Sequence, residues 1–334
     1  MNVDLLKILR CPKSGQRLVL EKAEYRQGSI YSGWLISEGG GHRYEIQNFI
    51  PRFVRKSNYA DNFGMQWNKF RQTQLDSYSG HDISANRFWR ATAWLPEDMD
   101  GQLVLDIGCG AGRFAEIALH AGAHVVALDY SNSVDACFAN LRHYPNLHVV
   151  QGNIYELPLV KKAFRFVYSL GVLQHTPDVE KAFFALPLML SEGGRICVDF
   201  YQKSWKSALL PKYWLRPFTK HMSRNRLFSM LEYLVPKLLP VSAMIGKFPV
   251  LGGRLKRLVP VANHIDSLPL SERQQLEWSL LDTFDWLSPE FDNPQTPETV
   301  RRWMDEAGLE QVEVLKAGHL VGRAMAPDKN GLDL

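Results

Sequence analysis

The most constraining feature of this 334-residue chain is residues 103–118, which read LVLDIGCGAGRFAEIA. An aliphatic run meets Gly108, Gly110 and Gly112, and a helix-like apolar period follows at once. This pattern predicts a buried strand, a glycine turn and a helix. Such a turn brings backbone N–H groups at a helix N-terminus close to a nucleotide-like ligand, where side chains would obstruct the approach.

The spacing of the glycines and the charge before them separate two classes of nucleotide site. A dinucleotide fingerprint has the spacing G-x-G-x-x-G and presents a helix to a pyrophosphate. This chain has G-x-G-x-G, with Asp106 two residues before the first glycine. A carboxylate there would repel a pyrophosphate but suits a ligand that carries a cationic amine. The pattern therefore disfavours a nicotinamide-dependent dehydrogenase.

Asp106, Gly108, Gly110 and Gly112 resemble the first motif of the class I S-adenosylmethionine-dependent methyltransferases. The resemblance implies that the loop wraps the methionine part of S-adenosylmethionine, and that Asp106 acts on this part directly or through water. It extends to a core of the methyltransferase type 11/12 kind over residues 101–201.

Three later segments follow in the order that this resemblance requires. Residues 124–130 predict a second apolar strand that ends in Asp129. The carboxylate of Asp129 can accept hydrogen bonds from both ribose hydroxyls. Residues 147–153 end in Asn153, where the family usually has an Asp that accepts from the adenine amino group, and the amide oxygen of Asn153 can still accept. Residues 164–178 predict a fourth strand that ends beside the cofactor. The resemblance also makes cofactor contacts of Tyr130, Ile154 and Leu170.

Strand and helix patterns alternate between residues 101 and 201. This alternation predicts right-handed crossovers and a doubly wound, mostly parallel sheet, with ligands outside the carboxyl ends of its strands. The resemblance implies a seven-stranded, Rossmann-like α/β sheet that residues 291–334 complete with a helix and an antiparallel hairpin. Pro187 predicts a bend or an early end of the fourth helix.

Residues 1–56 are expected to form a small β-rich unit. They resemble the zinc-ribbon-like domains that accompany some methyltransferases, but Ser14 stands where a second knuckle cysteine would be. A structural zinc site needs about four ligands, and Cys11 with His42 cannot supply them. We therefore expect a unit without metal, which is either a docking or lid module or a plain extension.

Residues 57–100 are rich in aromatic and amide side chains. Phe63, Trp67 and Phe70 recur at helical spacing, which predicts an amphipathic helix. In the class I family the segment before the first core strand commonly crosses the mouth of the cofactor site. The alternative is a helix that simply packs on the sheet. The cap that the resemblance implies consists of Tyr59, Phe63, Gln66 and Trp67.

Residues 202–290 form a predicted helical insertion, or lid, that the resemblance does not explain. Between residues 202 and 260 there are twelve Lys and Arg against one acid, whereas the rest of the chain has 27 bases and 34 acids. Apolar residues are interleaved with these charges. Such a segment can hold an acidic substrate, lie on an anionic membrane or contact nucleic acid, which ranks third because no nucleic-acid module is present. A solvated lid is the alternative.

A sulfonium methyl donor needs no activation by the protein. The chain has only to position the nucleophile and, where the acceptor requires it, to remove a proton from the acceptor. His175, just beyond the fourth strand, is the first candidate for a general base. A structural role for this histidine is the alternative, and a carboxylate acceptor would need no base. The next candidates for the base are His81, His264 and Asp285, and further candidates for the substrate pocket are Asp282 and Trp286.

The cysteines and the distribution of apolar residues indicate in which cellular compartment to expect the chain. Four cysteines without paired spacing disfavour a disulfide framework. The N-terminus lacks the apolar core of a signal peptide and no uninterrupted run of about 18 apolar residues occurs, so we expect a cytoplasmic protein without a transmembrane helix.

The sequence thus predicts methyl transfer from S-adenosylmethionine to an oxygen of a small, sugar-linked or lipid-linked acceptor, which can be anionic. Peripheral membrane contact is expected through residues 202–260. One alternative is a cofactor-binding regulatory or interaction protein without turnover, and a weaker one is an NAD-dependent oxidoreductase. The oligomeric state stays open.

Overall fold

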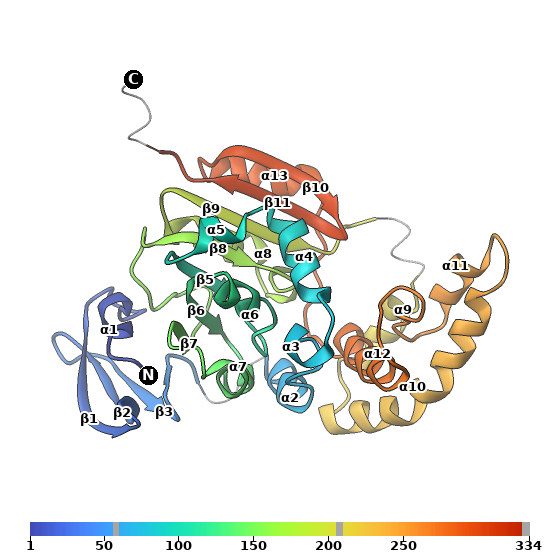
Figure 1. Cartoon of the computed structure of the whole chain (residues 1–334), viewed down its shortest axis with the longest axis horizontal. Helices are drawn as coiled ribbons and strands as arrows, with labels where there is room; N and C mark the ends of the chain where they lie inside the picture. The colour runs from blue at the N-terminus through green and yellow to red at the C-terminus, as the bar shows by residue number, and fades with distance from the viewer. Residues whose placement is uncertain (56–59, 205–209, 329–334) are drawn as a thin grey trace.

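A single mixed sheet organises the chain. The computed structural model describes residues 1–55, 60–204 and 210–328, so Tyr59 lies outside the described residues. Within the described ranges the sheet has eleven strands, in the order β1-β2-β3-β4-β7-β6-β5-β8-β9-β11-β10 (Figure 1). The parallel strands of the centre carry the aliphatic runs noted in the sequence.

The centre of the sheet matches the expected topology. Strands β5, β6, β7, β8 and β9 pair in parallel, and β11 pairs antiparallel with both β9 and β10. These seven strands form the predicted doubly wound core with its closing hairpin. Their bounds are β5 Leu103–Ile107, β6 His124–Asp129, β7 Leu147–Gln151, β8 Phe164–Ser169, β9 Leu190–Phe200, β10 Glu310–Ala317 and β11 His319–Met325.

The prediction of a seven-stranded sheet is wrong in extent. Four strands of the N-terminal unit continue the sheet beyond β7, because the unpaired backbone of an edge strand can accept a further strand. The junction is a single parallel pair between Arg52 and Gln151. The added strands are β1 Leu18–Arg26, β2 Ser29–Ser37, β3 Arg43–Gln47 and β4 Ile50–Arg52, and a short helix, α1 (Leu5–Ile8), precedes them.

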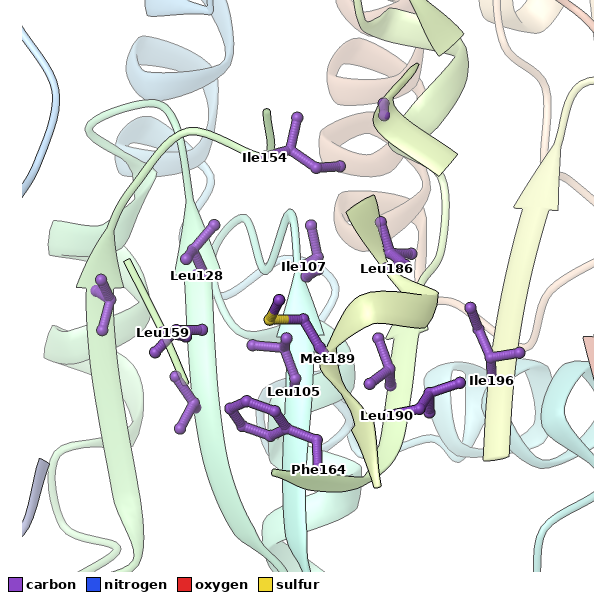
Figure 2. Packing of buried hydrophobic residues seen from close by; sticks show 14 of the residues in the cluster. Leu105, Ile107, Leu128, Ile154, Leu159, Phe164, Leu186, Met189, Leu190 and Ile196 are labelled. Atoms are coloured by element: carbon purple, nitrogen blue, oxygen red, sulfur yellow. The ribbon is translucent and has the colours of Figure 1, made fainter. Parts of the chain in front are cut away.

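Both faces of the central sheet are buried, as the continuous aliphatic strands require. Neighbouring residues of β5 belong to different buried clusters: Leu105 to the first and Val104 to the second. Figure 2 shows Leu105, Leu128 and Phe164 packed together in the first cluster. Helices α8 (Val179–Ala185) and α13 (Pro297–Glu306) belong to the first cluster, and α4 (Ile83–Thr92), α6 (Arg113–His120) and α7 (Ser133–Leu141) to the second.

Short helices complete the framework. The bend expected at Pro187 is present, because α8 ends at Ala185 and a 3₁₀ turn, η2 (Pro187–Met189), follows. Before β5 the chain forms α2 (Asp61–Lys69), α3 (Asp76–Ser79) and α5 (Pro96–Met99) besides α4.

The insertion forms its own helical layer with a third buried cluster. Its described helices are α9 (Pro211–Thr219), α10 (Arg224–Gly246), α11 (Gly252–Leu255), η4 (Lys256–Leu258) and α12 (Glu272–Leu287). Phe228 of α10 packs on Phe284 of α12 and on Phe70 next to α2, with ring centroids 5.6 and 5.7 Å apart respectively. Figure 1 shows these helices (orange) at the opposite end of the molecule from β1–β3 (blue).

Helix α10 requires a correction to the expectation of no membrane-spanning segment. By length and composition alone it could cross a membrane, with 28% of its most apolar window buried inside the structure. A search for an uninterrupted apolar run misses it, because charged residues and Pro236 and Pro240 interrupt the apolar sequence. One face of the helix is nevertheless buried in the core that it shares with α12, through Leu231, Val235 and Leu239.

The junction between the N-terminal strands and the core yields a stability prediction. The Arg52 guanidinium donates to Gln151 Oε1 at 2.8 Å and to Asp135 Oδ1 at 2.6 Å, and its side chain is only 13% exposed. Gln151 is buried and would lose this charged donor, whereas Asp135 would be solvated, so Arg52→Ala should lower the free energy of unfolding by about 2 kcal/mol. Urea denaturation measures this change.

Arg26→Ala is the matched control. Arg26 pairs with Glu24 at 3.0 Å, but both side chains are 53% exposed. Because exposed ion pairs contribute little, we expect a change within about 0.5 kcal/mol. Equal losses in the two variants would contradict the role given to the junction.

Candidate functional site

A cavity of about 1130 Å³ opens at the carboxyl ends of the parallel strands. Its wall includes Gly108 after β5, Asp129 at the end of β6, Gly152 after β7 and Leu170 after β8. This is where open α/β sheets bind ligands. The volume exceeds that of a typical pocket for one small ligand, so the cavity has room for two.

The glycine loop has a backbone that only glycine adopts easily. Gly108, Gly110 and Gly112 have φ values of +81°, +53° and +94°. A Cβ on Gly108 would collide with the Val172 side chain, and one on Gly112 would lie 2.6 Å from Leu141 Cδ1. The loop therefore leaves its backbone exposed to a ligand in the cavity.

Asp129 fixes the loop in place. One carboxylate oxygen accepts from the Ser131 backbone at 2.7 Å and from the Ser131 hydroxyl at 2.8 Å, while the other accepts from the Gly110 N–H at 3.0 Å. Burial raises the pKa of Asp129, and these hydrogen bonds oppose that rise. A carboxylate has about four lone-pair sites, so ligand hydroxyls can still donate to it.

Asp106 lies beneath the loop as a buried acid. It is 2% exposed, and its Oδ2 has no hydrogen-bond partner among the described residues. Burial raises its pKa to about 8, and nearby Asp129 adds to the rise. A cationic ligand group in the cavity would stabilise the ionised form, so the residues present fit a cofactor that carries positive charge.

The cap predicted from the sequence divides into two parts. Phe63 and Trp67 of α2 line the cavity, and the Trp67 ring lies 3.3 Å from the Cβ position of Gly110. Gln66 is fully buried behind this wall, with no hydrogen-bond partner among the described residues for its amide.

Several predicted site residues lie in the cavity wall and others do not. Asn153 lies outside the wall, and its Oδ1 accepts from the Tyr155 N–H at 3.1 Å, so its adenine contact stays a prediction. His81 lines a separate, smaller depression. The wall contains Gly108, Gly110, Asp129, Tyr130, Ile154, Leu170, Phe63, Trp67, His175 and Asp285, and excludes Asp106, Gly112, Asn153, Gln66 and His81.

His175 is held in one tautomer. It lies on a 3₁₀ turn, η1 (Leu173–His175), and is 6% exposed. Its Nδ1 is 3.0 Å from the Phe291 carbonyl oxygen, which can only accept, so Nδ1 carries the proton. Nε2 is then the acceptor, and this buried atom has no hydrogen-bond partner among the described residues. The ring packs against Phe63, with centroids 5.4 Å apart, and against Tyr201 at 5.5 Å.

The insertion supplies acids and a second histidine to the wall. Asp285 lies 3.5 Å from the Tyr201 hydroxyl, and burial raises its pKa despite the nearby His175. His264 Nε2 lies 2.7 Å from Asp282 Oδ2, and both residues line the cavity. Nitrogen and oxygen bases of the insertion therefore share one cavity with the glycine loop.

Two arginines contribute positive charge. Arg87 of α4 donates to Asp199 at 2.9 Å, and Arg113 of α6 donates to Gln74 at 3.0 Å. Their guanidinium carbons lie 5.2 and 5.1 Å from the centroid of the Phe114 ring. Burial lowers the pKa of Arg113 to about 9, and the neighbouring Arg87 adds to the effect.

Arg113 was not expected in the cavity wall, although the sequence carries a signal for it. Arg113 follows Gly112 directly and begins α6, where the helix dipole favours an anion over a cation. A cation in that position indicates that its charge interacts with a group outside the helix. Trp278 and His319 also line the cavity, and no local pattern distinguishes them.

Part of the chain is similar in sequence to known methyltransferases. Residues 105–198 match the family described as Methyltransf_11, a methyltransferase domain. The phosphoethanolamine N-methyltransferase 2 of Caenorhabditis elegans is 31% identical over 109 residues, covering 31% of this chain and 25% of that protein. The tRNA U34 carboxymethyltransferase of Pseudoalteromonas translucida is 33% identical over 132 residues, covering 36% and 41% respectively.

The chain spans less than half of the length of either curated relative. Among solved structures, the magnesium protoporphyrin IX methyltransferase of Synechocystis aligns with a TM-score of 0.45 and 15% identity. The alignment covers 80% of this chain and 96% of that one.

The buried acid yields a prediction for pH dependence. The pKa of Asp106 is about 8 in the folded protein, against an ordinary value of 3.8. The folded protein thus keeps a proton that the unfolded chain releases, and this contribution to stability is present below about pH 4 and is lost as the pH rises to about 8. Without ligand, the free energy of unfolding should fall more steeply over this range in the unmodified protein than in Asp106→Asn.

Urea denaturation at several pH values between about 4 and 8 measures the two slopes. The comparison isolates Asp106, because the other titrating groups are the same in both proteins. Parallel curves would show that Asp106 is ionised in the folded protein throughout this range.

Proposed function

We propose, from the premise that residues 105–198 form a class I S-adenosylmethionine-dependent methyltransferase domain, that this chain methylates an oxygen of a small, sugar-linked or lipid-linked acceptor. The observation that carries the proposal is one cavity whose wall combines two sets of residues: the glycine loop with Asp129, and residues of the insertion such as His264, Asp282 and Asp285. We also propose a cytoplasmic location.

The residues that the domain motifs provide would hold S-adenosylmethionine. Asp106 supplies a buried carboxylate oxygen for positive charge, and Asp129 supplies acceptors for hydroxyls. Ile154 and Leu170 offer apolar surface, and Phe63 and Trp67 cover the loop. When bound, S-adenosylmethionine supplies an electrophilic methyl group on a sulfonium.

His175 is the proposed general base. Its Nδ1–H is held by the Phe291 carbonyl, so the Nε2 lone pair is available for the proton of an acceptor hydroxyl. The positive charge of a protonated His175 lowers the pKa of Asp285, so the two groups interact across the cavity wall. The proton leaves the acceptor oxygen as this oxygen attacks, and Nε2 receives it. The His264–Asp282 pair is the second candidate for the base.

Arg87 and Arg113 support an acceptor with an anionic group. The guanidiniums of Arg87 and Arg113 both lie close to the Phe114 ring, and they repel each other. Burial and this repulsion lower the pKa of Arg113. A carboxylate or phosphate bound beside them would offset this repulsion, because charge-assisted bonds to guanidinium are strong.

The zinc-ribbon-like origin of residues 1–56 is part of the proposal as well. In its support, Cys11 follows the short helix α1 and is buried, and its Sγ lies 3.2 Å from the Tyr44 hydroxyl. The strands of this unit pair with the core sheet, which favours a structural or docking role.

Calorimetric binding of S-adenosylmethionine, S-adenosylhomocysteine and NAD tests the cofactor assignment. We expect both adenosyl ligands to bind and NAD not to bind. Asp129→Ala should weaken their binding at least about tenfold, because it removes hydroxyl acceptors and releases the Gly110 N–H. Binding of NAD in preference to the adenosyl ligands would overturn the proposal.

His175→Gln tests the proposed base with an acceptor found by screening hydroxyl compounds with and without an anionic group. Glutamine can keep a hydrogen bond to the Phe291 carbonyl but cannot take the proton. The turnover number should fall by about 10²- to 10⁴-fold. Binding of S-adenosylmethionine should stay within about threefold.

Two further histidine variants serve as comparisons. His81→Gln should leave turnover unchanged, because His81 lies outside the main cavity. A larger loss in His264→Gln than in His175→Gln would assign the base to the His264–Asp282 pair instead.

A further inference from the structure

The end of α10 and the turn that follows expose an unusual amount of apolar surface. We call the exposed apolar residues between positions 241 and 258 the apolar tip. Val250 is 98% exposed, Met244 63% and Phe248 60%. The members of the apolar tip are Val241, Met244, Phe248, Val250, Leu251, Leu255 and Leu258.

This exposure is concentrated in one part of the chain. Among the described residues, eighteen large apolar side chains are exposed, and eleven of them lie between Trp214 and Leu258. Figure 1 shows α11 at the outer end of the insertion, away from the central sheet, where α10 leads to it. Apolar patches of this kind mark contacts with a partner or a membrane, whereas scattered exposed residues need no explanation.

The shape of the apolar tip is built into the fold. The Gly252 N–H donates to the Phe248 carbonyl at 3.0 Å, and a Cβ on Gly252 would lie 2.6 Å from the Gly246 carbonyl oxygen, so the turn closes tightly on the end of α10. At its apex Val250 has a φ of +64°, a conformation that β-branched residues rarely adopt. The fold thus holds an apolar side chain outward at a cost in backbone strain.

The charged residues of the chain segment that carries the apolar tip all have one sign. Residues 233–265 contain no acid. Glu232, just before them, already pairs with Lys69 at 2.8 Å. The basic residues of this segment are Lys237, Lys247, Arg254, Lys256 and Arg257. An apolar surface surrounded by Lys and Arg is complementary to a bilayer with anionic headgroups.

The rest of α10 limits how this surface can meet a membrane. Leu231, Val235 and Leu239 are buried against Phe284 and Leu287 of α12. Spanning the bilayer would require this core to open. Only the apolar tip and its basic border are free to enter the interface, which is how monotopic proteins bind.

We infer that the apolar tip inserts into the interfacial region of an anionic lipid bilayer, with Lys247, Arg254 and Arg257 at the headgroups. This inference narrows the membrane contact expected of residues 202–260 to a defined structural element, and it does not depend on the proposed methyl transfer. The segment that follows the tip brings His264, Ser267 and Leu268 to the cavity wall, so docking would hold the cavity close to the lipid.

Vesicle co-sedimentation of the full chain tests the inference. We expect binding to phosphatidylcholine vesicles that contain about a third phosphatidylglycerol, weaker binding to pure phosphatidylcholine, and weakening by salt. Phe248→Ser with Val250→Ser should reduce the partition coefficient at least about tenfold, because apolar area no longer leaves water. Arg254→Glu with Arg257→Glu should reduce binding to the anionic vesicles by a similar factor and leave binding to neutral vesicles nearly unchanged.

Matched controls carry the same changes elsewhere. Val19→Ser with Leu188→Ser removes two side chains that are each 50% exposed but lie outside residues 202–290. Lys161→Glu with Lys316→Glu reverses two exposed charges of the core. Both controls should bind vesicles within about twofold of the unmodified chain. Urea denaturation verifies that the tip variants are folded.

Three outcomes would overturn the inference. The first is no binding to either kind of vesicle, and the second is equal loss in the tip variants and their controls. The third is self-association that only the tip variants abolish, measured by analytical ultracentrifugation without lipid, which would assign the apolar tip to contact between copies of the chain.

Discussion

The bond between Asp129 and the Gly110 N–H is the interaction on which the cavity depends. It joins the end of β6 to the loop after β5, at 3.0 Å, and holds three glycines in left-handed conformations. The loop in turn contacts Trp67 of α2 and positions α6. Since Ser131 occupies the other oxygen of the same carboxylate, the loop cannot relax without breaking several bonds together.

The cavity wall and the loop beside it hold charges that would be costly elsewhere. Asp106 is buried beneath the glycine loop, and Asp285 and Arg113 are partly buried in the wall. Burial shifts the pKa of each toward its neutral form. Natural structures keep such groups where ligands or catalysis use them, because burial of an unpaired charge opposes folding. A bound cation would offset the charge of Asp106, and a bound anion would offset the charge of Arg113.

The insertion has two surfaces with different tasks. Toward the core it supplies Asp282, Asp285 and His264 to the cavity and packs Phe228 against Phe70. Away from the core it presents apolar and basic residues to the surroundings. The segregation of charge in the sequence, with nearly all acids outside residues 202–260, follows from this division.

Local patterns in the sequence determined the strand, glycine loop and helix around Gly110, the parallel core strands and the break at Pro187. Apolar periodicity, left-handed φ angles and the missing proline N–H are the causes, and each acts between neighbours in the chain. Only the tertiary structure decided the pairing of Arg52 with Gln151, the contact of His175 with the Phe291 carbonyl 116 residues away, and the exclusion of Asn153 from the cavity wall. These depend on distant segments whose packing no local pattern encodes. The added strands β1–β4 have the same origin, since an edge strand accepts any segment that reaches it with matching backbone groups.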